Sequence, residues 1–201
     1  GTSVTGDLLM RSFKYFGHTG STFIDILLSK KFEMSLQADY QYKDYYDERT
    51  VDPLDHGNLD ASLEMDYELS RDHDFGLKLS FTDRRYFEYH SLDQNGHYSD
   101  LNPLRHFRYY KGKFDYNWTP LRGLRINPGI EVIRREDLYQ DYYSYLGVGG
   151  SLRLRYFSGK FYISVYGDYT RVEYDIRPAF TSSPNDPMLV YGYYDLSFVT
   201  R

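Results

Sequence analysis

The chain has 201 residues, of which 24 are Tyr and 13 are Phe, with no Cys and a formal net charge of −5. The absence of Cys excludes disulfides and thiolate metal sites, and an acidic chain without a basic stripe is not expected to bind nucleic acid. Mean hydropathy is −0.65, and no apolar run approaches the ~18 residues of a membrane-spanning helix. Because aromatic residues favour strands, we expect one all-β domain over residues 1–201.

The N-terminal part carries the weakest pattern, above all in residues 1–20. Residues 6–16, GDLLMRSFKYF, are apolar and aromatic and predict a strand, and the GHTG that follows predicts a turn. Residues 21–28, STFIDILL, predict a second short strand. From Phe32 to Lys43 apolar and polar residues alternate strictly, as in an extended strand with one apolar and one polar face.

The clearest alternation lies in residues 58–89, which read NLDASLEMDYELS, the turn RDHD and FGLKLSFTDRRYFEY. Apolar residues take every second position from Leu59 to Leu69 in the first arm and from Phe75 to Phe81 in the second, an arrangement that no helix can place on one face. Further strands are predicted at 107–118, 124–135, 142–156, 161–170 and 189–200. This makes about ten, most near the ~9–11 residues with which a tilted strand crosses a bilayer. Pro128 predicts an edge, a bulge or a local break in its strand.

The predicted connections alternate in length along the chain. Short turns are expected at 29–31, 71–74, 119–123 and 157–160, long polar loops at 46–57, 90–106 and 177–188, and a medium connection near 136–142. Short turns on one side and long loops on the other are typical of outer-membrane barrels. The long loops are then the candidate surfaces for other envelope proteins. Since Gly1 begins nothing like a signal peptide, we expect either a removed leader or a portion of a longer protein.

Aromatic residues near both ends of the predicted strands form two candidate membrane girdles. The girdle positions are Tyr40, Tyr42, Phe87 and Tyr89 near the long loops, and Trp118, Phe161 and Phe198 near the short turns. A soluble β-sandwich or meander also has alternating strands. The lipid interpretation is favoured because soluble strands average nearer ~5–6 residues, and because Gly, Ala and Tyr on the apolar face suit lipid better than a close-packed core.

Repeated units such as LQADYQYKDYYD, LEMDYELSRDHDFGLKLSF and VYGDYTRVEYD carry a family resemblance. Over about residues 21–200 the chain resembles Gram-negative outer-membrane β-barrel proteins of the porin type. The resemblance implies an antiparallel, up-and-down transmembrane β-barrel of about ten strands in the lipid bilayer of a bacterial outer membrane. The chain departs from that pattern at its end, where Val199, Thr200 and Arg201 follow Phe198 in place of a terminal aromatic residue.

If the apolar face meets lipid, the polar face lines a lumen with two differently charged walls. The acidic wall is Glu33, Asp39, Asp60, Glu64, Asp66 and Glu68, and the basic wall is Lys78, Arg84, Lys111, Lys113, Arg125, Arg135, Arg153 and Arg155. In a closed ten-strand barrel the two walls could face each other. Two interpretations stay open: a salt-bridge network that fills a narrow lumen, or a transverse field that orients charged solutes in a small pore.

The second long loop holds the residue types of two kinds of site. His90-Ser91, and His97 with Ser99 and Asp100, have the types of a hydrolytic centre but no family signature. The side chains of Asp93, Asn95 and Asp100, with Gly96, could bind Ca²⁺, although Asx-type turns are the simpler reading. His18, His56, His73 and His106 sit singly and predict no metal site. We therefore expect no enzyme, cofactor or metal.

The resulting functional expectation is a porin-like passive channel, or an export component, for small polar solutes or saccharide. One alternative is a structural barrel with a plugged lumen whose extracellular loops bind a partner. A second alternative is a soluble β-sheet binding protein.

Overall fold

A computed structural model of the chain describes residues 15–45, 55–159, 161–176 and 188–200, the last of these as backbone. Every regular element within these ranges is a strand. The strands are β1 (Tyr15–Ser29), β2 (Phe32–Tyr45), β3 (His56–Ser70), β4 (His73–His90), β5 (Leu104–Leu121), β6 (Leu124–Asp137), β7 (Tyr145–Ser158), β8 (Phe161–Tyr174) and β9 (Met188–Thr200). Within the described ranges, no helix is long and apolar enough to cross a membrane.

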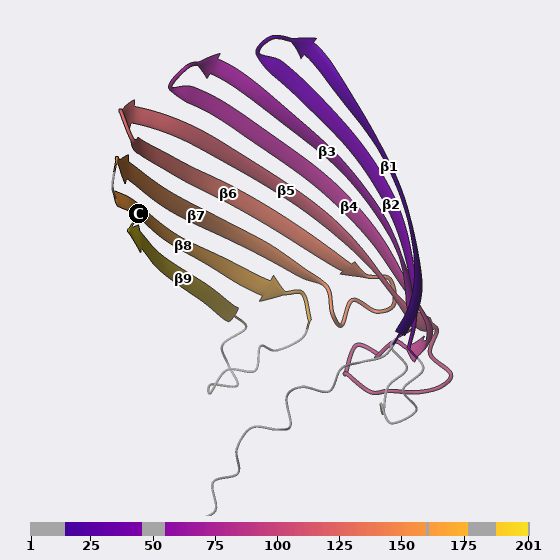
Figure 1. Cartoon of the computed structure of the whole chain (residues 1–201). Coiled ribbons are helices and arrows are strands. Elements are labelled where there is room, and N and C mark those ends of the chain that lie inside the picture. Colours follow the sequence, from indigo (N-terminus) through magenta and orange to yellow (C-terminus); the bar gives the residue numbers. More distant parts are fainter. Residues whose placement is uncertain (1–14, 46–54, 160, 177–187, 201) are drawn as a thin grey trace, which may run out of the picture.

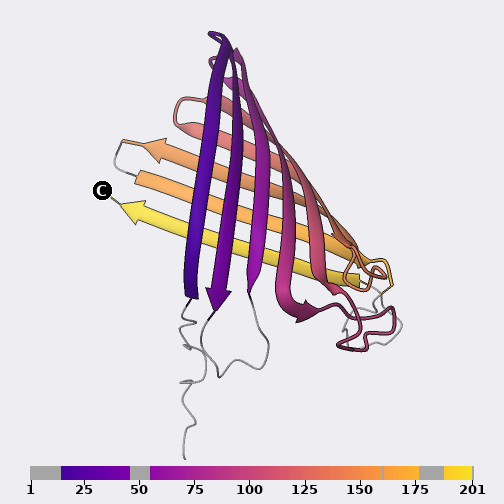
Figure 2. The same cartoon turned by 90° about the vertical axis from the view of Figure 1, so that its right-hand side faces the viewer.

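The strands form a single antiparallel sheet in the order in which they occur along the chain, β1 to β9. The predicted all-β, up-and-down architecture is therefore confirmed. Figures 1 and 2 show that the sheet twists strongly, so that β7–β9 run across the direction of β1–β3. In the described residues β1 pairs only with β2 and β9 only with β8, and the sheet is not closed into a barrel.

The N-terminal prediction needs one correction. The GHTG segment is not a turn but part of β1, in which Gly17 pairs with Lys43 and Gly20 with Tyr40. The reason is tertiary: β2 is 14 residues long and offers ladder hydrogen bonds to the whole stretch, which outweighs the turn preference of Gly. The structure therefore has one strand, β1, where two strands around a turn were predicted. Residues 1–14, which include most of the first predicted strand, lie outside the described residues.

The alternation of short and long connections is confirmed where the structure describes it. The connections after β1, β3, β5 and β7 each span two residues and lie at one end of the sheet, whereas residues 91–103 lie at the other (Figure 1). Gly123 (φ +87°) takes a backbone conformation that favours glycine and tightens the turn between β5 and β6. Most of the predicted loops 46–57 and 177–188 lies outside the described residues.

Pro128 interrupts one ladder and not the other. It pairs with Leu152 of β7, but the β5–β6 ladder has no pair at Pro128. A missing N–H removes a hydrogen bond toward one neighbour only, so the predicted local break is confirmed on the β5 side.

Two faces result from the alternation, and few apolar side chains are buried. Among the described side chains, only Phe107 (5% exposed) and Val172 (8% exposed) are buried apolar ones, and both lie on the polar face. The apolar face is instead exposed over β2–β8, with side chains such as Leu79, Phe114 and Val148 uncovered by any described residue. The sheet therefore has no second layer in the described chain.

Candidate functional site

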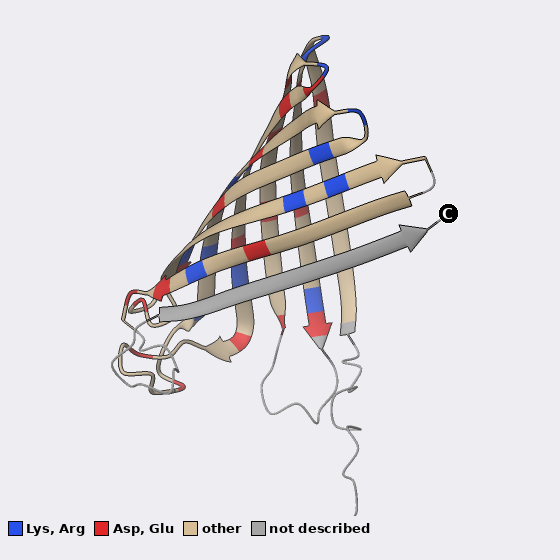
Figure 3. Cartoon of the chain, turned by 90° about the vertical axis from the view of Figure 1, so that its left-hand side faces the viewer, with Lys and Arg blue, Asp and Glu red and all other residues tan. Residues whose placement is uncertain are grey.

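All the predicted wall residues lie on one face of the sheet, which we call the polar face. The acidic residues are on β2 and β3 and the basic residues on β4–β7, as the charge colouring of Figure 3 helps to follow. The two sets meet where Glu64 of β3 pairs with Lys78 of β4. They are thus neighbours in the sheet. Whether they also face each other across a closed barrel stays a prediction.

Charged side chains line a depression of about 420 Å³ on this face, which we call the charged groove. Glu64 and Asp66 enter it from β3, Arg153 and Arg155 from β7, and Tyr166 from β8. Because side chains from β3 and β8 line the same depression, the sheet curves toward its polar face. Gly129 of β6 makes room at the groove, since a side chain there would crowd the side-chain oxygens of two groove residues, Asp115 and Ser151.

Each lysine in or beside the groove is paired with a carboxylate. The three pairs are Lys78–Glu64 at 3.0 Å, Lys111–Glu131 at 2.7 Å and Lys113–Asp115 at 2.9 Å. Their side chains are mostly more than a third exposed, and such pairs contribute only ~0–1 kcal/mol each to stability. The pairs therefore neutralise charge on the polar face more than they hold the sheet together.

The arginines of the basic wall make contacts of another kind. Arg84 donates through Nε to Asn58 Oδ1 at 2.8 Å, and Arg155 donates to Asn127 Oδ1 at 2.8 Å. The Arg153 guanidinium lies 4.8 Å from the Tyr166 ring centroid. No carboxylate partner is described for these three arginines.

A second group of polar-face residues packs beneath the connections 91–103 and 138–144, and we call it the loop-side cluster. It consists of Tyr89, Arg105, Phe107, Arg135, Asp137 and Tyr143. Arg105 lies 3.7 Å from the Tyr89 ring centroid and 4.8 Å from that of Tyr143. Arg135 donates through Nε to the Tyr143 carbonyl at 2.6 Å. Cation–π contacts of this sort are worth about 0.5–2 kcal/mol each.

Asp137, at the loop end of β6, is the charged centre of this cluster and is only 3% exposed. Its carboxylate accepts hydrogen bonds from the backbone N–H groups of Tyr139 and Tyr143 at 3.1 and 3.3 Å. Burial raises the pKa of Asp137, although these hydrogen bonds and the charges of Arg105 and Arg135 oppose it. The cluster thus fills the loop end of the polar face with tightly packed side chains.

On four strands the apolar face changes to charged residues toward the long-loop end. The four charged residues each stand two positions beyond the last apolar residue of this face, on its long-loop side. They are Asp83 beyond Phe81 in β4, Arg108 beyond Tyr110 in β5, Arg134 beyond Val132 in β6 and Arg171 beyond Tyr169 in β8. Between these charged residues and the short-turn end, the apolar face runs from Tyr110 to Trp118 in β5 and from Phe161 to Tyr169 in β8, nine residues in each strand. We call this part of the apolar face the apolar band.

An ionic belt of paired charges lies above the apolar band. Asp83 accepts from Arg85 Nε at 2.9 Å, lies 2.8 Å from His106 Nε2 and 3.3 Å from Arg108 Nε. Arg134 pairs with Asp175 in the same belt. The sequence carries a signal for this belt, because Asp83, Arg108 and Arg134 occupy the parity of the apolar face, although none of the sequence predictions includes it.

The predicted girdle residues fall into three groups. Tyr40, Tyr42 and Phe87 lie on the apolar face near the belt, where the Tyr42 and Phe87 rings are 5.5 Å apart. Trp118 and Phe161 lie exposed on that face at the short-turn end. Tyr89 is placed differently, in the loop-side cluster against Arg105. Phe198 is in register with Ile163, and its side chain lies outside the described residues.

Residues 91–103 form an ordered loop around Asp93 and Asn102. The Asp93 carboxylate accepts hydrogen bonds from the backbone N–H groups of Asn95 and His97, both at 2.8 Å, so the predicted Asx-type turn is confirmed. The bond from His97, and then that from Asn95, hold the pKa of Asp93 below its ordinary value. Ser91 is 0% exposed, which removes its hydroxyl from any substrate. Within the described ranges, no group of three acidic or His side chains is arranged to hold a metal ion.

No protein-family model and no curated protein matches the sequence. The features that bear on function are therefore the sheet and its two faces.

Proposed function

We propose that the chain forms the wall of a porin-like β-barrel in a bacterial outer membrane, with the apolar band against lipid and the polar face toward a lumen. The apolar band is the observation that carries this proposal. Eight steps of about 3.4 Å, in strands tilted by about 40°, span roughly 21 Å of bilayer height. This is close to the ~25 Å apolar band of outer-membrane barrels.

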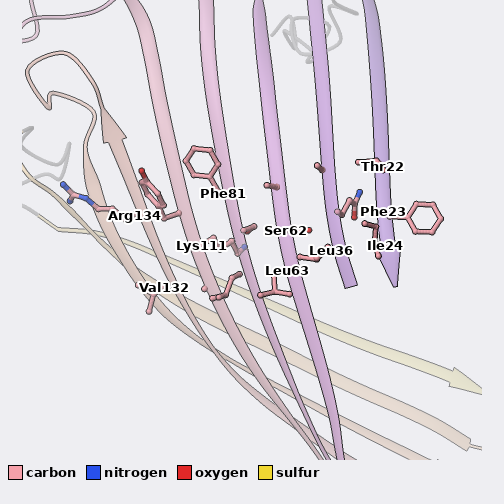
Figure 4. A pocket seen from close by; sticks show the side chains of 17 residues that line it. Thr22, Phe23, Ile24, Leu36, Ser62, Leu63, Phe81, Lys111, Val132 and Arg134 are labelled. Atoms are coloured by element: carbon pink, nitrogen blue, oxygen red, sulfur yellow. The ribbon is translucent and has the colours of Figure 1, made fainter. Parts of the chain in front are cut away.

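The shape of the apolar face supports contact with lipid. A shallow depression of about 860 Å³ crosses β1–β6 on this face, and Leu36, Leu63 and Val132 are among the residues that line it (Figure 4). The small residues Ala38, Ala61 and Gly112 also line it. Such a surface suits mobile acyl chains. A soluble monomer rarely exposes a continuous apolar patch beyond a few hundred Å², whereas here the exposed apolar side chains continue over β2–β8.

Barrel closure is part of the proposal. The described sheet has two edges, β1 and β9, and an open edge is costly within a bilayer. Antiparallel strands alternate in direction, so β1 and β9 run the same way. Closure of the barrel therefore pairs β1 with β9 in parallel or requires an additional strand between them.

The lumen would carry small polar solutes or saccharide past the charged groove. Because the lysine–carboxylate pairs on β3–β6 neutralise each other, they contribute little to the electrostatic field in the lumen. The ion selectivity of the pore is then set by the charges that are not paired. Replacing Glu64 by Gln frees Lys78 from its partner and should shift the ion selectivity of the pore toward anions. Conductance of the protein in a planar bilayer, with a salt gradient, measures this shift.

The first test is heat-modifiability of the protein purified in detergent. A closed barrel has no unpaired edge, so it should resist SDS and migrate apart from its boiled form. Co-migration of boiled and unboiled protein, together with good solubility after detergent is withdrawn, would refute the membrane proposal and favour the soluble β-sheet alternative.

The loop-side cluster favours a second candidate, a barrel plugged at its loop end. The only two buried apolar side chains described, Phe107 and Val172, lie on the polar face, and the Arg105 and Arg135 contacts fill the space beside Phe107. A plugged barrel would be heat-modifiable but would not conduct. Conductance in planar bilayers therefore separates the two candidates.

A further inference from the structure

The arginines at the short-turn end of β6 and β7 lack the acidic partners that the lysines have. Among the described side chains, Arg125, Arg153 and Arg155 have no carboxylate oxygen within 4.0 Å, whereas Lys78, Lys111 and Lys113 each have one. The register places Arg125 directly opposite Arg155. Like charges in that position repel each other, so the three arginines concentrate positive charge at one place.

Asn127 belongs to the same group and leaves hydrogen-bond donors unused. It is directly opposite Arg153, and its Oδ1 accepts from Arg155 Nη2 at 2.8 Å. Asn127 Nδ2 and Arg155 Nε are buried without an acceptor among the described residues. Arg125 and Arg153 are exposed, so a solute can reach them. The group therefore offers several hydrogen-bond donors that have no acceptor among the described residues.

We propose that Arg125, Asn127, Arg153 and Arg155 form an arginine site that binds the carboxylate or phosphate group of a small anionic solute. An oxyanion supplies several acceptor oxygens at once and offsets the repulsion between the arginines. The guanidinium fork matches both carboxylate and phosphate geometry. The contact of Arg153 with the Tyr166 ring limits the motion of one fork before a ligand arrives.

The position of the arginine site gives it a role in the proposed function. It follows the turn at 122–123 and so lies at the short-turn mouth of the charged groove, with Glu64 and Asp66 on the β3 side of that groove. The acidic side repels an anion and the arginine site attracts it. The inference rests on the proposed function for treating the polar face as a lumen, and it specifies the solutes as anionic.

The test is binding by the folded protein in neutral detergent, at low ionic strength, followed by calorimetry. Inorganic phosphate and glucuronate should bind, and glucose should not. Arg153→Gln should weaken both anions at least tenfold, as expected for the loss of a charged hydrogen-bond donor. The matched control is Lys113→Gln, which removes the same charge from the same groove but from a residue paired with Asp115, and should change binding less than twofold.

A second measurement separates binding from a structural role. In buffer without phosphate, Arg125→Gln should raise the midpoint of thermal unfolding, because it removes repulsion from Arg155; it should also lose most of the rise that phosphate gives the unmodified protein. A lowered midpoint without phosphate would show that Arg125 stabilises the sheet and would overturn its place in the site.

Two further results would overturn the arginine site. Failure of both anions to bind would do so. Equal weakening by Arg153→Gln and Lys113→Gln would point to a general field. A protein that conducts without binding anions keeps the proposed function and loses this inference, whereas anion binding without heat-modifiability supports the site and overturns the barrel.

Discussion

Leu79→Arg tests whether the apolar face meets lipid or water. Leu79 lies in the middle of β4, pairs with Leu63 and Gly112, and is 44% exposed. On a soluble sheet, an exposed position of this kind tolerates substitution within about 0.5 kcal/mol. On a bilayer-facing strand, an Arg near the midplane costs about 2–4 kcal/mol. The two environments thus differ by about 1.5 kcal/mol or more, which is roughly tenfold or more in the folding equilibrium.

The assay is reversible urea unfolding in phospholipid vesicles, followed by tryptophan fluorescence from the single Trp, Trp118. Ser62→Arg is the matched control, because Ser62 neighbours Leu63 on the same strand but lies on the polar face, where it pairs with Gln37 and Ser80. We expect a loss of at least 2 kcal/mol for Leu79→Arg and less than about 1 kcal/mol for the control. Equal small losses for both variants would refute lipid contact on this face.

Three further predictions concern turns, packing and pH. Gly123→Ala should lower the free energy of unfolding by more than about 2 kcal/mol, because the added Cβ meets the Phe157 carbonyl oxygen. Gly159 is also at positive φ but faces open space, so Gly159→Ala should cost about 1 kcal/mol, and urea unfolding compares the two variants. Phe107→Ala should cost about 3 kcal/mol in the same assay, and a loss below about 1 kcal/mol would contradict a packed loop-side cluster. Because the pKa of Asp93 is lowered on folding, its stabilisation of loop 91–103 is present above about pH 4 and lost as pH falls through the lowered pKa. Amide hydrogen exchange in the loop should accelerate there, and unchanged protection would exclude the carboxylate as the cause.

The strands themselves were predictable because their signal is local. From Phe32 to Lys43, from Leu59 to Leu69 and from Phe75 to Phe81, each apolar residue is two positions from the next, and β2, β3 and β4 contain those stretches. The turn at RDHD and the turn at Gly123 were predictable for the same reason, since Gly and Asp set local backbone geometry. The GHTG segment shows the limit. Its own composition predicts a turn, but pairing with β2 determines a strand.

The candidate site was predictable by face but not by partner. Alternation alone placed Glu64, Lys78 and Arg155 on one face, because a period of two leaves no other choice. Alternation does not predict the register between strands. The register places Lys78 opposite Glu64 and Arg155 opposite Arg125. The prediction of an acidic and a basic wall left open which charges pair; in the structure Lys78, Lys111 and Lys113 each lie beside a carboxylate.

The sequence by itself determined the strands, their two faces and the lengths of their connections, because these depend on residues close together in the chain. The tertiary structure decided what brings distant residues together: the curvature that gathers β3–β8 around one groove, the loop-side cluster around Phe107, and the register that sets Arg125 of β6 opposite Arg155 of β7. These depend on register and twist, which many pairings along the sheet fix jointly and no single segment specifies.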